Sequence, residues 1–133
     1  MGWYNFGKAT NEKKNLYVKN LKLFEKEMNK LGYKIYLSFG TLLGAIREND
    51  FIAHDDDIDI AYLSKYNNKK KANIEKYNIR NILLEKGMLE HEKDTLGTKV
   101  KYNNTYYDMY TSWIDGEWIY LNPFFKSKKK NII

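Results

Sequence analysis

The residues best suited to chemistry lie within residues 38–62. Four of the five residues 55–59 are aspartates: Asp55, Asp56, Asp57 and Asp59. Carboxylates this close together raise one another's pKa unless a cation or hydrogen-bond donors offset their charge. Upstream, the turn Gly40–Thr41 opens a predicted short helix, and free N–H groups at a helix start suit a phosphate. The pattern predicts a metal site beside a phosphate cradle, and therefore phosphoryl-group chemistry.

Residues 57–63 (DIDIAYL) are predicted to form a strand, which determines the face of the sheet to which each aspartate points. Side chains alternate along a strand, so Asp57 and Asp59 share one face and the intervening isoleucine points to the other. Asp55 shares the face of this pair if the strand begins early, whereas Asp56 points away. The predicted metal ligands are therefore Asp57 and Asp59, with Asp55 as a further ligand.

Spacing excludes other common metal and phosphate sites. An EF-hand loop starting at Asp55 needs Gly at its sixth position and Glu at its twelfth, and these positions hold Ile60 and Tyr66. Zinc is disfavoured because the chain has no cysteine and only two histidines. No Walker A loop occurs. Carboxylate ligands alone suit Mg²⁺ or Mn²⁺ held jointly with substrate phosphates.

Asp108 is a second unusual acidic residue, because it lies in the aromatic segment 106–112 (YYDMYTS). Aspartate is disfavoured in such a strand, so some feature must compensate for it. Either it faces water from an edge strand or it belongs to a site. Together with the upstream aspartates it is a candidate third carboxylate.

The elements that must position these residues alternate between helices and strands. Apolar residues at helical spacing predict two long helices: from residue 11 to a stop at Gly32, and from Asn67 or Asn68 to residue 86. A short helix is expected at residues 41–48. Aromatic and β-branched runs predict strands: 33–39, 57–63, 88–92, 98–103, 106–112 and 117–121, with residues 122–123 ending the last. This order favours an α+β or mixed α/β fold.

Length and charge bound the remaining possibilities. A chain of 133 residues is expected to form a single domain, 1–133, with a loosely ordered leader at 1–9 and a basic tail at 126–133. The net charge is +6, and most of the basic residues are lysines. Such lysines indicate a solvated surface or a surface that attracts anionic substrates. In the basic tail they could instead bind an anionic membrane surface. Dedicated nucleic-acid binding is not expected. With no cysteine, signal peptide or long apolar run, we expect a cytoplasmic protein, with the inner face of the membrane as the alternative that the tail suggests.

Residues 38–60 (SFGTLLGAIRENDFIAHDDDIDI) closely resemble the signature of the LicD family, which includes fukutin-type proteins within the nucleotidyltransferase-fold superfamily. Shared features are the Gly-Thr turn, Leu-Leu-Gly-Ala-hydrophobic-Arg, a Phe-Ile pair and Asp-hydrophobic-Asp after further aspartates. The resemblance implies a central mixed sheet flanked by helices. It also implies metal-dependent transfer of a phospho-substituted group, such as phosphocholine, from a CDP-linked donor to a hydroxyl of a cell-surface glycan, as in capsule or lipopolysaccharide biosynthesis.

The resemblance also implies roles for particular residues. Asp57 and Asp59 would hold the metals, and Asp108 would act as a third ligand or as the base for the attacking hydroxyl. Gly40 and Thr41 would contact the donor phosphate. Arg47 would lie nearby, either on phosphate or in a structural ion pair with an aspartate.

The chain departs from the family pattern at His54, where tryptophan is usual, and at Ala53, where proline is usual. Family members are also usually longer. Two alternatives to the phosphotransferase hypothesis therefore remain: a small nucleotidyltransferase acting on protein or RNA, and a non-catalytic remnant or binding module that keeps the fold.

Overall fold

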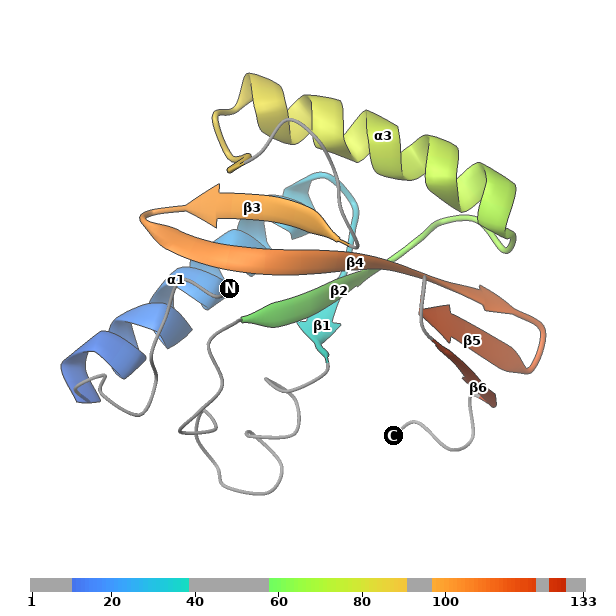
Figure 1. The fold of residues 1–133 in the computed structure, drawn as a ribbon, viewed down its shortest axis with the longest axis horizontal. Helices are drawn as coiled ribbons and strands as arrows, with labels where there is room; N and C mark the ends of the chain where they lie inside the picture. Colours follow the sequence, from blue (N-terminus) through green and yellow to red (C-terminus); the bar gives the residue numbers. More distant parts are fainter. Residues whose placement is uncertain (1–10, 39–57, 91–96, 122–124, 129–133) are drawn as a thin grey trace.

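The structure is a computed structural model that describes residues 11–38, 58–90, 97–121 and 125–128. These residues form two helices and a mixed six-stranded sheet (Figure 1). The helices are α1 (Asn11–Lys30) and α3 (Lys69–Glu85). The strands are β1 (Ile35–Leu37), β2 (Asp59–Leu63), β3 (Thr98–Tyr102), β4 (Thr105–Asp115), β5 (Trp118–Leu121) and β6 (Phe125–Lys128). The predicted α+β class is confirmed.

Strand β4 is the centre of the sheet. The strand order is β1-β2-β4-β5-β6, and β3 also pairs with β4. The pairing of β2 with β4 is parallel, and every other strand pair is antiparallel. Parallel neighbours need a crossover connection, and the chain between β2 and β4 includes α3 (Figure 1). The fold thus brings β2 and β4, which are far apart in sequence, side by side.

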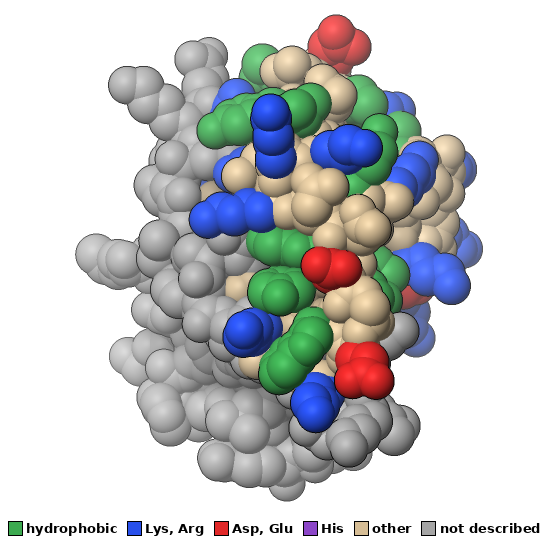
Figure 2. All heavy atoms as spheres, turned by 90° about the vertical axis from the view of Figure 1, so that its right-hand side faces the viewer, with side chains coloured by type: hydrophobic (Ala, Val, Ile, Leu, Met, Phe, Trp, Pro, Cys, Tyr) green, Lys and Arg blue, Asp and Glu red, His purple; other side chains and the backbone are tan. Residues whose placement is uncertain are grey.

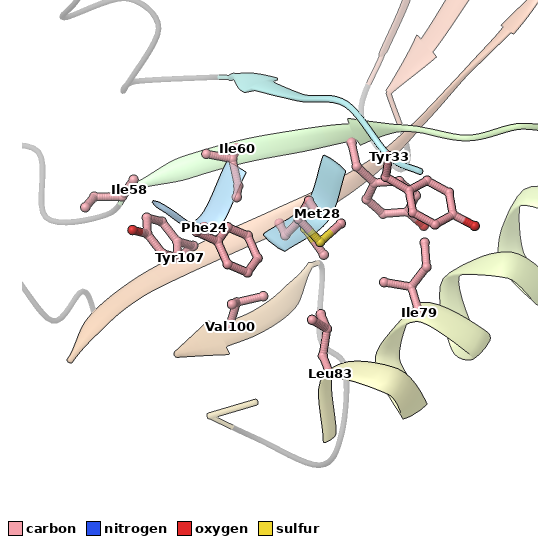
Figure 3. Close-up of a cluster of buried hydrophobic side chains, with 11 residues drawn as sticks. Phe24, Met28, Tyr33, Ile58, Ile60, Ile79, Leu83, Val100 and Tyr107 are labelled. Carbon is pink, nitrogen blue, oxygen red and sulfur yellow. The ribbon is translucent and has the colours of Figure 1, made fainter. Parts of the chain in front are cut away.

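The hydrophobic core lies between the helices and one face of the sheet. Phe24 and Met28 from α1 meet Ile79 and Leu83 from α3 over strands β2, β3 and β4 (Figure 3). The strand side chains in this cluster include Ile60, which is fully buried. Both helices therefore cover the same face. Side chains that alternate with the core residues point to the opposite face of the sheet.

The helix ends follow the predicted capping signals. The side chain of Asn68 caps α3 by accepting a hydrogen bond from the backbone N–H of Lys71 at 2.9 Å. Gly32 and Gly87 follow the two helices with φ of 91° and 71°, a left-handed conformation that suits glycine. The predictions of the two long helices are confirmed.

The hairpin β3–β4 turns at Asn103 and Asn104, whose φ angles are 49° and 61°. Positive φ at both residues is the geometry of a two-residue type I′ turn, which asparagine tolerates well. On the helix side, Asn20 of α1 donates a hydrogen bond to the Thr105 hydroxyl at 2.7 Å. The start of β4 is therefore fixed to α1.

Several strand boundaries differ from the sequence predictions. Strand β5 ends at Leu121, as predicted, but the prediction that it is the last strand is wrong, because β6 follows and pairs with it. Part of the predicted tail, 126–128, belongs to β6. Strand β4 extends to Asp115 because it gains β5 as a partner there. Of the predicted strand 88–92, the structure describes residues 88–90, which form an isolated bridge between Leu89 and Val100. The predicted helix at 41–48 and leader at 1–9 lie outside the described residues.

Candidate active site

Asp59 and Asp108 lie side by side at the start of the parallel β2–β4 pair. They are register partners in this pair. Neighbouring strands are roughly 4.8 Å apart, and partners at the same register point to the same face. Both residues are buried, with 8% and 4% of their surface exposed. The fold therefore places two carboxylates next to each other in a dry environment.

This carboxylate pair lies on the sheet face opposite to the helices. Ile58 and Ile60, on either side of Asp59, belong to the hydrophobic core (Figure 3). The predicted alternation along this strand is therefore confirmed for Asp59. Asp108 is buried on β4, which has neighbours on both sides, and this excludes an edge-strand aspartate facing water.

Backbone and side-chain hydrogen bonds fix the register of the carboxylate pair. The N–H of Asp108 donates to the carbonyl of Ile58 at 2.9 Å. Three and four residues past Asp108, side chains also join the two strands. The hydroxyls of Tyr62 and Thr111 are 2.8 Å apart, and Ser112 Oγ donates to the Tyr62 carbonyl at 2.6 Å. A slip of one residue would break this set and turn the aspartates to the core face.

Lys99 supplies the positive charge nearest to this pair within the described residues. It lies opposite Asp108 in the β3–β4 register, and its Nζ forms an ion pair with Asp108 Oδ1. The Asp108 side chain is only 5% exposed, whereas that of Lys99 is 23% exposed. A buried carboxylate without a partner is costly, so this ion pair offsets part of the cost of burying Asp108. Sequence reasoning missed Lys99, because only the strand register distinguishes it from the other lysines.

The side of the site toward β1 is lined by neutral polar groups. Ser38 continues the β1–β2 register opposite Asp59, and its N–H donates to the Asp59 carbonyl at 3.0 Å. Ser38 is 2% exposed, and its hydroxyl has no hydrogen-bond partner among the described residues. Burial raises the pKa of the Tyr36 hydroxyl above its ordinary value of 10.0, although a hydrogen bond with Ser112 acts in the opposite direction. At neutral pH Tyr36 is therefore uncharged.

The described part of the chain contains two of the predicted metal ligands. No group of three or more His, Cys, Asp or Glu side chains that could hold a metal ion occurs in these residues. Two adjacent buried carboxylates nevertheless match the chemistry of Mg²⁺ and Mn²⁺ sites, which use one or two carboxylates together with substrate phosphates. The other predicted site residues lie outside the described ranges: Asp55, Asp57, Gly40, Thr41 and Arg47.

A mixed sheet with helices on one face and buried paired carboxylates on the other is suited to a transferase of phosphorylated substrates. A family model described as LicD/FKTN/FKRP, nucleotidyltransferase domain, matches residues 32–132. This interval contains α3, all six strands of the described sheet and every predicted site residue. The chain therefore belongs to the LicD family, which is of the phosphotransferase type.

No curated protein matches the chain. Among the helices in the described ranges, none is long and apolar enough to cross a membrane.

Proposed function

We propose that the protein is a metal-dependent phosphotransferase that moves a phospho-substituted group, such as phosphocholine, from a CDP-linked donor to a hydroxyl of a cell-surface glycan. The observation that carries this proposal is the buried pair of Asp59 and Asp108 on adjacent central strands of a LicD-family chain. Two buried aspartates on adjacent strands repel each other, and a bound divalent cation would offset this repulsion.

Asp59 and Asp108 would hold Mg²⁺ or Mn²⁺ together with Asp57, and Asp55 is a further candidate ligand. Such an ion would supply positive charge that offsets the charge on the transferring phosphoryl group and on the leaving cytidine monophosphate. The carboxylates provide a fixed anionic site, because the β2–β4 hydrogen bonds hold them in register. Holding reactants in place and stabilising charge account for most of the catalysis of phosphoryl transfer.

Asp108 is proposed as a third metal ligand or as the base for the attacking hydroxyl, and its ion pair with Lys99 fixes its carboxylate on the sheet. Gly40 and Thr41 are proposed to contact the donor phosphate from the family motif, and Arg47 is proposed to lie nearby.

The distribution of charge supports anionic substrates. Lysine side chains are interspersed with hydrophobic side chains on the side of the molecule that carries β5 and β6 (Figure 2). Between β4 and β5, the rings of Trp113 and Tyr120 stack with their centroids 5.3 Å apart, and Lys126 Nζ on β6 lies 5.0 Å from the ring centroid of Trp118 on β5. Aromatic rings beside ammonium groups suit a glycan that carries negative charge, because sugar rings pack on aromatic faces and the lysines attract the anion.

The protein is proposed to act in the cytoplasm, at the inner face of a membrane. The chain has no cysteine, which fits the reducing cytoplasm. Residues 129–130 extend the lysine series of β6, so the end of the chain is proposed to contact the inner face of an anionic membrane. Binding of nucleic acid is not part of the proposal, because the chain has only two arginines, Arg47 and Arg80, and lysine lacks the bidentate donors used to read bases.

A thermal-shift screen of cytidine, adenosine and uridine nucleotides, each with Mg²⁺ or Mn²⁺, tests the proposal. Binding to the folded state alone raises the melting temperature. We expect the largest metal-dependent rise with CDP and CDP-linked donors. A preference for ATP-type donors would favour the nucleotidyltransferase alternative. If no nucleotide gave a metal-dependent rise, the enzyme hypothesis would fail and the non-catalytic alternative would replace it.

A further inference from the structure

Four polar side chains form one row across the sheet face that carries the carboxylates. The register partners run from β1 to β3 in the order Ser38, Asp59, Asp108 and Lys99. Asp59, Asp108 and Lys99 each lie on a different strand, Ser38 directly follows β1, and adjacent members are one strand spacing apart, about 4.8 Å. The carboxylate pair is therefore flanked by a hydroxyl on one side and an ammonium on the other.

Lys99 can reach more than one acceptor. Its Nζ pairs with Asp108, whose side chain is almost fully buried. Its own side chain is more exposed, and lysine carries its charge on a flexible four-carbon stem. If a divalent cation neutralised the carboxylates, the attraction between Lys99 and Asp108 would weaken, and the ammonium would be attracted to a phosphate oxygen bound in the same row.

Ser38, on the other side of the carboxylate pair, has a hydroxyl without a hydrogen-bond partner among the described residues. This hydroxyl is buried. Most buried polar groups in proteins are paired, because an unpaired one costs free energy. A buried hydroxyl beside a carboxylate pair is suited to donate to an oxygen of a ligand held there.

We propose that Lys99 and Ser38 bind the phosphate groups of the substrate, forming an anion subsite on both sides of the carboxylate pair. Lys99 leaves Asp108 and binds a phosphate oxygen when donor and cation enter together, and Ser38 donates its hydroxyl to the same phosphate groups. The ligand class is a diphosphate complexed with a divalent cation. The identification of this diphosphate as that of the donor rests on the proposed function, but the subsite itself does not.

Variants of Lys99 test this subsite with two probes, Mn²⁺ alone and inorganic pyrophosphate with Mn²⁺. In Lys99→Met, Mn²⁺ alone should bind several-fold more tightly by electron paramagnetic resonance, because the competing ammonium is gone. Pyrophosphate should bind on the order of tenfold more weakly by calorimetry, because a charge-assisted hydrogen bond is lost. Lys99→Arg keeps the charge and should retain pyrophosphate binding even if the methionine variant fails to fold.

Lys101→Met is the matched control. Lys101 lies two residues further along β3, so it is on the same face as Lys99, but its Nζ lies 5.6 Å from the ring centroid of Tyr106. This variant should bind both probes like the wild type. Wild-type pyrophosphate affinity in Lys99→Met would overturn the subsite, and so would an equal loss in the Lys101 control. Unchanged affinity for Mn²⁺ alone would overturn the exchange of partners.

Ser38→Ala tests the hydroxyl separately. The variant should melt at the same temperature as the wild type or higher, because an unpaired buried hydroxyl is removed, yet bind pyrophosphate several-fold more weakly. Ser112→Ala is its complement: it removes a hydroxyl that donates to the Tyr62 carbonyl, so it should melt lower and bind pyrophosphate normally. Wild-type binding by Ser38→Ala would overturn the role of Ser38.

These outcomes separate the subsite from the proposed function. If pyrophosphate binding depends on Lys99 but cytidine nucleotides bind no better than others, the subsite stands and the CDP-linked donor is wrong. If CDP-linked donors bind with metal but pyrophosphate binding ignores both residues, the proposed function stands and the subsite is overturned.

Discussion

Replacing Asp108 by asparagine should leave the metal-free protein nearly as stable as the wild type while removing its response to metal. Two charges about 5 Å apart repel by about 3 kcal/mol at an effective dielectric constant of about 20, which is the estimate for Asp59 and Asp108. An ion pair at about 4 Å gains about 4 kcal/mol under the same conditions, which is the estimate for Lys99 and Asp108. The substitution removes both terms, so the free energy of unfolding without metal should change by about 1 kcal/mol or less.

The stabilisation by bound metal should differ far more between the wild type and Asp108→Asn than the stability without metal. In the wild type, Mn²⁺ at about a hundred times its dissociation constant should add about 2.7 kcal/mol, or roughly 10 °C for a domain of this length. Circular dichroism melts with EDTA or with Mn²⁺ would measure this increment, and we expect Asp108→Asn to lose most of it. Asp115→Asn, at the exposed end of β4, is the matched control and should keep it. A loss of several kcal/mol in EDTA would mean that Asp108 is a structural ion-pair residue, and an undiminished increment would refute its role as a ligand.

Three further predictions concern the surrounding scaffold. Burial and the nearby charge of Glu75 raise the pKa of Tyr33 to about 12. After allowance for solvent screening, this shift contributes on the order of 1 kcal/mol, which should be complete below pH 10 and lost as the pH rises from about 10 to 12. Alkaline unfolding of Tyr33→Phe should lack this loss. Asn20→Asp should lower the free energy of unfolding in urea by about 2 kcal/mol or more, because the donor to Thr105 becomes a buried charge, and an unchanged midpoint would contradict the role of this hydrogen bond. Gly97→Ala should cost about 1 kcal/mol or more in the same assay, because the added methyl group would lie 3.1 Å from the Tyr110 ring; wild-type stability would show that the ring yields freely.

Sequence patterns predicted the helices and the faces of the strands, because these features depend on residues close to one another in the chain. Apolar spacing and the caps at Gly32 and Asn68 located both long helices, because helical periodicity and capping involve residues close in sequence. Strand alternation placed Asp59 opposite the core face for the same reason. Asp108 was found as a chemical anomaly, a carboxylate in an aromatic strand, and the resemblance to the LicD family gave it a role.

The missed features depend on contacts between distant segments. The parallel pairing of β2 with β4 sets Asp59 beside Asp108, and no local signal encodes this register. Lys99 and Ser38 acquire their significance only from that row, because a lysine in an alternating strand and a serine at a strand end are ordinary in sequence. Strand β6 was missed because Pro123 and the following lysines indicated a tail, whereas pairing with β5 stabilises it.

The most direct test of the central claim is the turnover of a CDP-linked donor, such as CDP-choline, with Mg²⁺ or Mn²⁺ by the wild type and by Asp59→Asn. The account predicts metal-dependent release of the cytidine nucleotide by the wild type and a rate lower by about a hundredfold or more in a variant that remains folded. Asp57→Asn should behave in the same way. A wild-type rate in folded Asp59→Asn would contradict the assignment of the carboxylate pair as the reactive centre.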